Sequence, residues 1–479
     1  MTAIRRFLLV YVLLVLTTIS VAQRQEVHIL SVNDMHANLD NMPRLAGVVD
    51  SLRTLYPSLL LFSAGDNRTG NPINDLYTPS GYPVVALMNQ MGFSASAIGN
   101  HEFDNNSLSL LCGLSTFPYI CANIHADDST GIKAIPYHLF DVNGIKVGVI
   151  GVIQTNEYGT PDAHPNVLRG MSFESPFDVV GRYEWLRREC DITILLSHVG
   201  YYGDIKLAEM NPWIDLIIGG HSHRQLSENE PLHNGVLITQ NRNFLGRATH
   251  ITLVLDSGKV VSKTTDYINI RPSETSSTLV KQMVEVFNSN PYFKRKLTVA
   301  TSPFTTRNEV GTMVCDALLS ETKSDVALIN FRGIRVQRMK AGDICVRDAL
   351  EIDPFGNQAV VTNLRGDQLE KLIIEYGRMN IYQFPHLSGL HADLIINQDD
   401  PSEITKVTIT DMKGKPIKKR KIYRVVTNSY VAEKAEHLLP NATEVLNITT
   451  SDILMSFLQK QPFVNYQGKS NLNYIRAKK

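Results

Sequence analysis

The segment AIGNHEFDNN, residues 97–106, places an amide, an imidazole and two carboxylates within five positions, directly after an apolar run. These side chains belong to Asn100, His101, Glu102 and Asp104. A short polar run after an apolar one is typical of a loop that follows a β-strand. A loop that only ended a strand would not need all four groups, so the segment raises the question of what they do together.

Four other segments repeat this pattern of an apolar run that ends abruptly in polar residues: VHILSVND, SLLLFSAGD, DITILLSH and WIDLIIGGHSH. Helix-like stretches lie between them, for example at residues 84–91 and 178–188, and a hairpin is expected to turn at Ser257-Gly258. This alternation predicts an α/β domain between about residues 26 and 269. Because ligand sites in such folds lie beyond the carboxyl ends of strands, we expect the five polar ends to meet at one edge of one sheet.

The polar residues at these ends are of the types that bind metal ions: Asp34, His36, Asp66, Asn100, His198, His221 and His223. A single histidine at a strand end is more often structural, but five strand ends with Asp, Asn or His are hard to explain in that way. Buried carboxylates and imidazoles are costly together unless cations hold them. Oxygen and nitrogen ligands without thiolates suit zinc or manganese, so the sequence predicts two divalent ions that would activate a water against a phosphoryl group.

The composition is that of a soluble globular protein, with 43% hydrophobic residues and 47 Lys plus Arg against 47 Asp plus Glu. The absence of a basic excess argues against a nucleic-acid polymer as a partner. A length of 479 residues favours two domains. The five cysteines lack metal-binding spacing and are interpreted as mostly buried apolar residues, with a Cys112–Cys121 disulfide as an alternative.

Residues 1–22 have the features of a secretory signal peptide, with Arg5 and Arg6 before an apolar run and a cleavage site after Ala22. An uncleaved membrane anchor is the alternative, although the apolar run is shorter than the roughly 20 residues of a typical span. Glycosylation sequons at Asn67 and Asn105 flank the predicted site, where a glycan would obstruct it. We therefore expect a secreted protein, made by a route without N-glycosylation such as export to a bacterial periplasm.

A polar, helix-compatible segment at 272–298 is predicted to link the first domain to a second αβ region. In that region, helices are expected at 308–321, 347–353, 366–377 and 450–460, and strands at 325–331, 357–364 and within 404–428.

The order D-x-H, G-D, G-N-H-E-x-D, H and G-H-x-H resembles the metallophosphoesterases, and specifically the secreted 5′-nucleotidase family. The resemblance implies a four-layer domain at 23–271, in which helices flank a β-sandwich, then a hinge at 272–298 and a smaller αβ substrate-binding domain at 299–479. It implies one metal site formed by Asp34, His36, Asp66 and His223, and a second formed by Asp66, Asn100, His198 and His221. His101 would face the phosphate as a dyad with Asp104, while Glu102 would support the turn.

The segments DVALINFRGIR and IDPFGNQ resemble the nucleotide-binding motifs of the same family. By position, the substrate-binding residues would be Asn330, Arg335, Phe355, Tyr430 and, within TRNEVGTMVCDAL, Arg307. Phe355 and Tyr430 would be the two faces of a base-stacking clamp, with a core aromatic as the alternative for Phe355. The sequence departs from the family where Arg332 replaces a small residue and where Gly-Gly-Asp-Gly is missing after Tyr430.

The resulting prediction is a secreted dimetal hydrolase that releases phosphate from nucleoside 5′-monophosphates. Within the same chemistry, a 2′,3′-cyclic nucleotide phosphodiesterase and a UDP-sugar or dinucleotide pyrophosphatase are alternatives. A non-enzymatic nucleotide-binding surface protein is disfavoured because every expected metal ligand and both dyad residues are present.

Overall fold

The computed structural model describes residues 24–227, 230–270, 276–379, 384–397, 404–439 and 443–476. The predicted signal peptide and its cleavage site after Ala22 lie outside these residues. The chain forms two compact units, one made of residues up to 68 together with 78–286, the other of 69–77 and the residues from 287 onward. Among the described helices, none has the length and apolar character needed to cross a bilayer.

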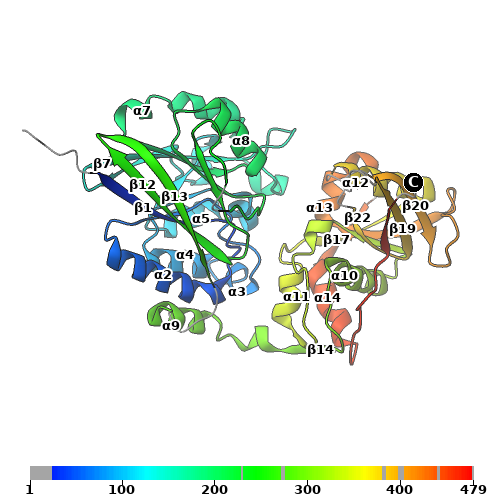
Figure 1. Ribbon diagram of the computed structural model, residues 1–479. Coiled ribbons are helices and arrows are strands. Elements are labelled where there is room, and N and C mark those ends of the chain that lie inside the picture. Colours follow the sequence, from blue (N-terminus) through cyan, green and yellow to red (C-terminus); the bar gives the residue numbers. More distant parts are fainter. Residues whose placement is uncertain are drawn as a thin grey trace, which may run out of the picture. The chain divides into compact units, whose positions relative to one another are not determined.

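Two sheets form the centre of the first unit (Figure 1). The six-stranded sheet has the order β13-β12-β1-β2-β3-β4, with bounds β1 Gln25–Val32, β2 Leu60–Ser63, β3 Ala95–Ala97, β4 Tyr119–Ile120, β12 Arg247–Asp256 and β13 Lys259–Asn269. The five-stranded sheet has the order β11-β10-β9-β7-β6, with bounds β6 Tyr137–Val142, β7 Ile145–Ile153, β9 Ile192–His198, β10 Leu216–Gly219 and β11 Leu237–Gln240. A separate antiparallel pair is formed by β5 (Ile124–Ala126) and β8 (Met171–Phe173).

Strands that carry predicted ligands pair in parallel within each sheet: β1 with β2 and β2 with β3 in one, β9 with β10 in the other. The two sheets bury a shared core, in which Ile29 and Phe62 of one sheet pack with Val149 and Ile194 of the other. Strands covered on both faces are expected to be rich in apolar residues, and β2 and β9 are buried along their whole length.

Helices cover the outer faces of the two sheets, with α2 and α4 on one side and α7 and α8 on the other (Figure 1). Their bounds, with those of the other helices of this unit, are α2 Met42–Leu55, α4 Tyr82–Met91, α5 Leu108–Leu114, α6 Pro176–Val179, α7 Leu186–Glu189, α8 Tyr201–Met210 and α9 Thr278–Phe287. A second core, which includes Leu186, Leu195 and Leu207, fills the space between α6–α8 and the five-stranded sheet. The order of layers is helix, sheet, sheet, helix.

The described part of the second unit contains three sheets and its own core. The largest has the order β18-β15-β21-β17-β22, with bounds β15 Val326–Ile329, β17 Gln358–Arg365, β18 His386–Ser388, β21 Ile422–Asn428 and β22 Thr443–Thr449. The others are β20-β19-β23 (β19 Leu390–Ile396, β20 Ile404–Asp411, β23 Leu472–Arg476) and β14-β16 (β14 Lys296–Ala300, β16 Gly342–Cys345). The helices are α3 Pro72–Asp75, α10 Arg307–Thr322, α11 Val346–Ile352, α12 Gly366–Met379, α13 Ser429–Lys434 and α14 Thr450–Gln459.

The α/β class and the two-domain organisation are confirmed, but two details of the sequence interpretation are wrong. The five polar strand ends belong to two sheets rather than one, because β9 pairs with β7 and β10, and neither β9 nor β10 pairs with β3. The helix expected at 178–188 is interrupted by a 3₁₀ turn at Val180–Tyr183 that contains Gly181, a poor helix former. All five cysteines are free thiols, of which Cys121, Cys190 and Cys315 are buried.

Candidate active site

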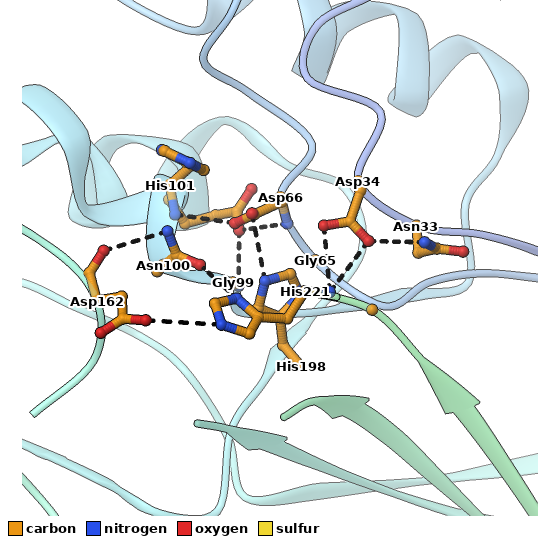
Figure 2. Close-up of polar contacts among 12 residues, drawn as sticks. Asn33, Asp34, Gly65, Asp66, Gly99, Asn100, His101, Asp162, His198 and His221 are labelled. Carbon is orange, nitrogen blue, oxygen red and sulfur yellow. Dashed lines mark hydrogen bonds and ion pairs between the residues drawn. The ribbon is translucent and has the colours of Figure 1, made fainter. Parts of the chain in front are cut away.

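The predicted metal ligands lie on loops at the carboxyl ends of five strands in the first unit. Asp34 and His36 follow β1, Asp66 follows β2, Asn100 follows β3, His198 ends β9, and His221 and His223 follow β10. Figure 2 shows that the side chains of Asp34, Asp66, Asn100, His198 and His221 converge on one place. The loops of both sheets therefore supply one cluster.

Four of these residues form the group expected for the first metal site. One ligand atom from each of Asp34, His36, Asp66 and His223 lies within 4.8 Å of all the others. The Nε2 atom of His223 is 3.2 Å from Nε2 of His36 and 3.2 Å from Oδ1 of Asp34. Nitrogen and carboxylate donors at this spacing fit a divalent ion such as zinc or manganese.

The residues expected at the second site lie on the other side of Asp66. Oδ2 of Asp66 is 3.3 Å from Nε2 of His198, and Nδ1 of His221 is 3.0 Å from Oδ1 of Asn100. The imidazole rings of His198 and His221 have centroids 5.2 Å apart. Asp66 is thus next to both groups, as a bridging ligand would have to be.

His198 shows most directly that a cation fits here. Its side chain is fully buried, and its Nδ1 donates to the backbone carbonyl of Ala64 at 2.7 Å. The remaining nitrogen, Nε2, has no hydrogen-bond partner among the described residues, although it points at the Asp66 carboxylate. A histidine that donates one ring N–H to a backbone carbonyl has its tautomer fixed in the way usual for a metal ligand, and its other nitrogen can bind a cation once it is deprotonated.

The charged groups of the cluster shift one another's pKa values. Burial raises the pKa of Asp66, but the neighbouring charges of His198 and His101 outweigh it and hold the pKa well below the ordinary value. Burial lowers the pKa of His198, but the charge of Asp66 outweighs that effect and raises the pKa to about 10. His221 behaves differently, since burial and the charge of His198 lower its pKa to about 4. Protonated His198 thus compensates carboxylate charge that cations would otherwise neutralise.

The loop backbone has an unusual conformation at five predicted ligands, which all have positive φ: Asp34 (48°), His36 (47°), Asp66 (53°), His221 (72°) and His223 (56°). Left-handed backbone is uncommon outside glycine and clusters at functional sites. Hydrogen bonds between loops hold it, because Asp34 N donates to Gly65 O at 2.9 Å and His36 N donates to Asp66 O at 3.0 Å. Gly99 allows the close approach of the next loop, since a Cβ there would lie 2.2 Å from Oδ1 of Asp66.

Glu102 supports the turn, as the sequence predicted, and it also connects two ligand loops. Its buried carboxylate accepts backbone N–H groups from Asp66 at 2.9 Å, Asn67 at 2.8 Å and Gly99 at 2.7 Å. Burial and the charge of Asp66 raise its pKa. Glu102 therefore fixes the Asp66 loop against the loop of Asn100.

The expected dyad is present beside the cluster. Nδ1 of His101 is 2.8 Å from Oδ2 of Asp104, and the ring of His101 has its centroid 5.2 Å from that of His36. The fully buried Arg68 holds the Asp104 loop in place, donating to the Asp104 carbonyl and to Ser107 Oγ. Such a dyad places an imidazole, oriented by a carboxylate, next to the group formed by Asp34, His36, Asp66 and His223.

Gln240 was not predicted from the sequence, yet it holds the loop of His221 and His223. Its Nε2 donates to the Gly220 carbonyl at 2.9 Å, and its Oε1 accepts from Ser222 Oγ and from the Arg224 backbone N–H, both at 2.7 Å. It is the last residue of β11, after an apolar run. Gln240 could have been predicted from this position, because the metal ligands were identified by the same pattern of a polar residue at the end of an apolar strand.

The predicted substrate-binding residues lie in the second unit, on four of its segments. Oδ1 of Asn330, the residue after β15, accepts from Nδ2 of Asn428 at 2.9 Å. The guanidinium of Arg335 lies 5.8 Å from the ring centroid of Phe355, which is half-buried. Tyr430 lies in α13, and Ser429 beside it donates to the Asn357 side chain at 3.2 Å. Phe355 and Tyr430 are therefore on segments that contact each other.

Arg307 is the first residue of α10, and its guanidinium lies 4.8 Å from the ring centroid of Phe331. Burial and the charges of Arg335 and Arg332 lower the pKa of Arg307 to about 10. The ring of Phe331 stacks on the buried His386, with centroids 5.2 Å apart and planes at 21°. Sequence reasoning missed this aromatic pair, because His386 is remote in the sequence and carries no motif. The result is a positively charged region with half-buried aromatic groups nearby.

Comparisons with known proteins agree with this arrangement. Residues 27–225 match the family model described as calcineurin-like phosphoesterase, and residues 286–441 match that of the 5′-nucleotidase C-terminal domain. The chain is 26% identical to protein UshA of Yersinia enterocolitica, with 87% of this chain and 86% of that protein aligned. It is also 26% identical to the trifunctional nucleotide phosphoesterase protein YfkN of Bacillus subtilis, where the match covers 84% of this chain but only 31% of YfkN.

The fold has a close counterpart among solved structures. A 5′-nucleotidase precursor from Thermus thermophilus superimposes with a TM-score of 0.82 at 22% identity, covering 94% of this chain and 99% of that one. The two family models match in the same order along the chain as the two units. The chain belongs to the 5′-nucleotidase family of metal-dependent phosphoester hydrolases, with a calcineurin-like phosphoesterase domain followed by a 5′-nucleotidase C-terminal domain.

Proposed function

We propose that the protein is an exported 5′-nucleotidase that releases phosphate from nucleoside 5′-monophosphates. The observation that carries this proposal is the cluster of seven oxygen and nitrogen donors around Asp66, with the His101–Asp104 pair beside it. We assign Asp34, His36, Asp66 and His223 to one divalent ion, and Asp66, Asn100, His198 and His221 to a second. The names of the relatives support the substrate class, and the predicted signal peptide supports the export.

Two divalent cations at such a site neutralise phosphoryl oxygens and make water a nucleophile near neutral pH. In the hydrolysis, the oxygen of water bonds to phosphorus while the bond to the nucleoside 5′-oxygen breaks, and that oxygen takes up a proton. His101 donates from its ring to the phosphoryl oxygens as their charge grows, and Asp104 keeps the proton and orientation of Nδ1 fixed. The second unit binds the nucleoside, with Phe355 and Tyr430 as the stacking faces.

A substrate panel tests the proposal. Mature protein loaded with zinc or manganese is assayed with AMP, 2′,3′-cyclic AMP, UDP-glucose and p-nitrophenyl phosphate, with an EDTA-treated sample as the control. We expect AMP to give the highest kcat/KM and EDTA to abolish turnover of every substrate. Turnover of p-nitrophenyl phosphate alone would retain the dimetal chemistry but overturn the nucleotide assignment, and metal-independent turnover would overturn the mechanism.

A further inference from the structure

Asp162 contacts two of the assigned ligands, although it follows no strand and belongs to none of the sequence motifs. It lies in the loop between β7 and the 3₁₀ turn Pro165–Leu168. Its Oδ2 atom is 3.7 Å from Nε2 of His221, and its backbone carbonyl accepts from Nδ2 of Asn100 at 3.3 Å (Figure 2). Its side chain is 48% exposed, so a substitution there does not open the core.

The contact with His221 determines which ring nitrogen is available to a cation. Nδ1 of His221 lies 3.0 Å from Asn100 Oδ1, which can only accept, so a cation held by both atoms would replace the proton on Nδ1; Nε2 faces the Asp162 carboxylate. A neutral imidazole binds a metal through one nitrogen only when the proton is on the other. A carboxylate next to Nε2 favours the proton there, which leaves the Nδ1 lone pair for the metal. At 3.7 Å this contact is electrostatic, and a movement of roughly 0.8 Å would reach the usual hydrogen-bond length.

The contact with Asn100 has the same effect on a different ligand. An amide presents either oxygen or nitrogen to a neighbour, and only the oxygen can bind a cation. Because Nδ2 of Asn100 donates to the Asp162 carbonyl, its Oδ1 is turned toward Nδ1 of His221. Asp162 thus orients two ligands of the same ion, while the remaining histidine, His198, is oriented separately by the carbonyl of Ala64.

We infer that Asp162 is a positioning residue that selects the tautomer of His221 and the rotamer of Asn100, and so sets the affinity of the second metal site. The inference rests on the proposed assignment of two ions. It concerns binding rather than turnover, so it is tested without a substrate.

The experiment measures zinc bound per protein at equilibrium, over a series of free zinc concentrations set by a chelator buffer. Wild type is compared with Asp162→Asn and Asp162→Ala, and with Glu157→Gln as a control that removes the same charge from an exposed position of the same loop. We expect the Kd of the weaker ion to rise about 10- to 100-fold in both Asp162 variants, with the tighter ion unchanged. The control should match wild type, and Asp162→Glu should recover part of the loss.

Three results would overturn the inference. Asp162 variants that bind both ions as wild type does would show that the Asp162 carboxylate does not orient His221, since these variants keep the backbone carbonyl that accepts from Asn100. Equal weakening of both ions, or an equal loss in Glu157→Gln, would show a general effect of charge or of folding. If the wild-type protein bound a single ion, both the inference and the two-ion assignment would be overturned. If it bound two ions but hydrolysed none of the nucleotide substrates, the proposed function would fail and the role of Asp162 would stand.

Discussion

Replacing Glu102 with Gln should destabilise the protein even when no metal is bound. The carboxylate accepts three buried backbone N–H groups, two at Oε2 and one at Oε1. An amide has only one oxygen, so at least one of these donors would face an NH₂ group instead. A buried donor without an acceptor costs about 1–3 kcal/mol, and the remaining bonds lose their charge assistance.

One effect acts in the opposite direction. Burial and the charge of Asp66 raise the pKa of Glu102, which shows that its negative charge is unfavourable where it lies. Removal of the charge recovers part of that cost. We therefore expect a net loss of about 2 kcal/mol in the free energy of unfolding, or roughly a 30-fold change in the unfolding equilibrium.

The assay is urea denaturation of chelator-treated protein, followed by far-UV circular dichroism. Glu102→Gln should lower the midpoint without changing the slope, because the surface exposed on unfolding stays the same. Glu157→Gln, an exposed substitution of the same kind, should unfold like wild type. A Glu102→Gln midpoint equal to that of the control would refute the argument that the three N–H bonds hold the ligand loops together.

Three further predictions concern the dyad, the stacking clamp and a buried carboxyl group. His101→Ala should lower kcat by about 10²- to 10³-fold while mass spectrometry still finds both ions, and loss of an ion would make His101 a ligand instead. Tyr430→Ala should raise KM for AMP but not for p-nitrophenyl phosphate, and an equal rise for both would exclude a stacking role. Burial raises the pKa of Asp353 to about 6, so the folded state binds its proton more tightly than the unfolded state. The stability that this proton provides is complete below about pH 4 and is lost as the pH rises through 6, a change of up to about 3 kcal/mol. Asp353→Asn should lack this change, because an amide does not titrate. If the melting temperature of Asp353→Asn depended on pH between about 4 and 7.5 as that of wild type does, the prediction would be wrong.

Much of the first unit was predictable because each ligand directly follows a buried apolar strand. Segments such as VHILSVND and DITILLSH indicate both the strand and the point where it ends. In the structure, β1 ends two residues before Asp34, and β9 ends at His198 itself. The sequence could not assign these strands to separate sheets. A strand buried on both faces has the same apolar pattern whichever neighbour it pairs with, so the pairing of β9 with β7 leaves no local trace.

The residues that hold the ligands in place were harder to predict. Glu102 was expected to cap its own turn, but two of its three partners are Asp66 and Asn67, more than thirty positions away. Asp162 follows no strand, and only the fold brings it to His221. Interactions of this kind depend on distances between loops, which neither composition nor periodicity encodes.

The backbone of the ligand loops explains why those remote contacts matter. Asp34, Asp66 and His221 have positive φ, a conformation that costs of order 1–3 kcal/mol for each residue unless its surroundings impose it. A glycine in the sequence would suggest a positive φ at such a position, but Asp or His does not. Here the surroundings are visible: Gly65 and Asp66 accept from the Asp34 loop, and the Asp34 carboxylate accepts from the backbone N–H of His221 at 3.1 Å. The loops therefore hold one another in the strained conformation through hydrogen bonds of the chain itself, so the contacts between loops help to set the ligand geometry.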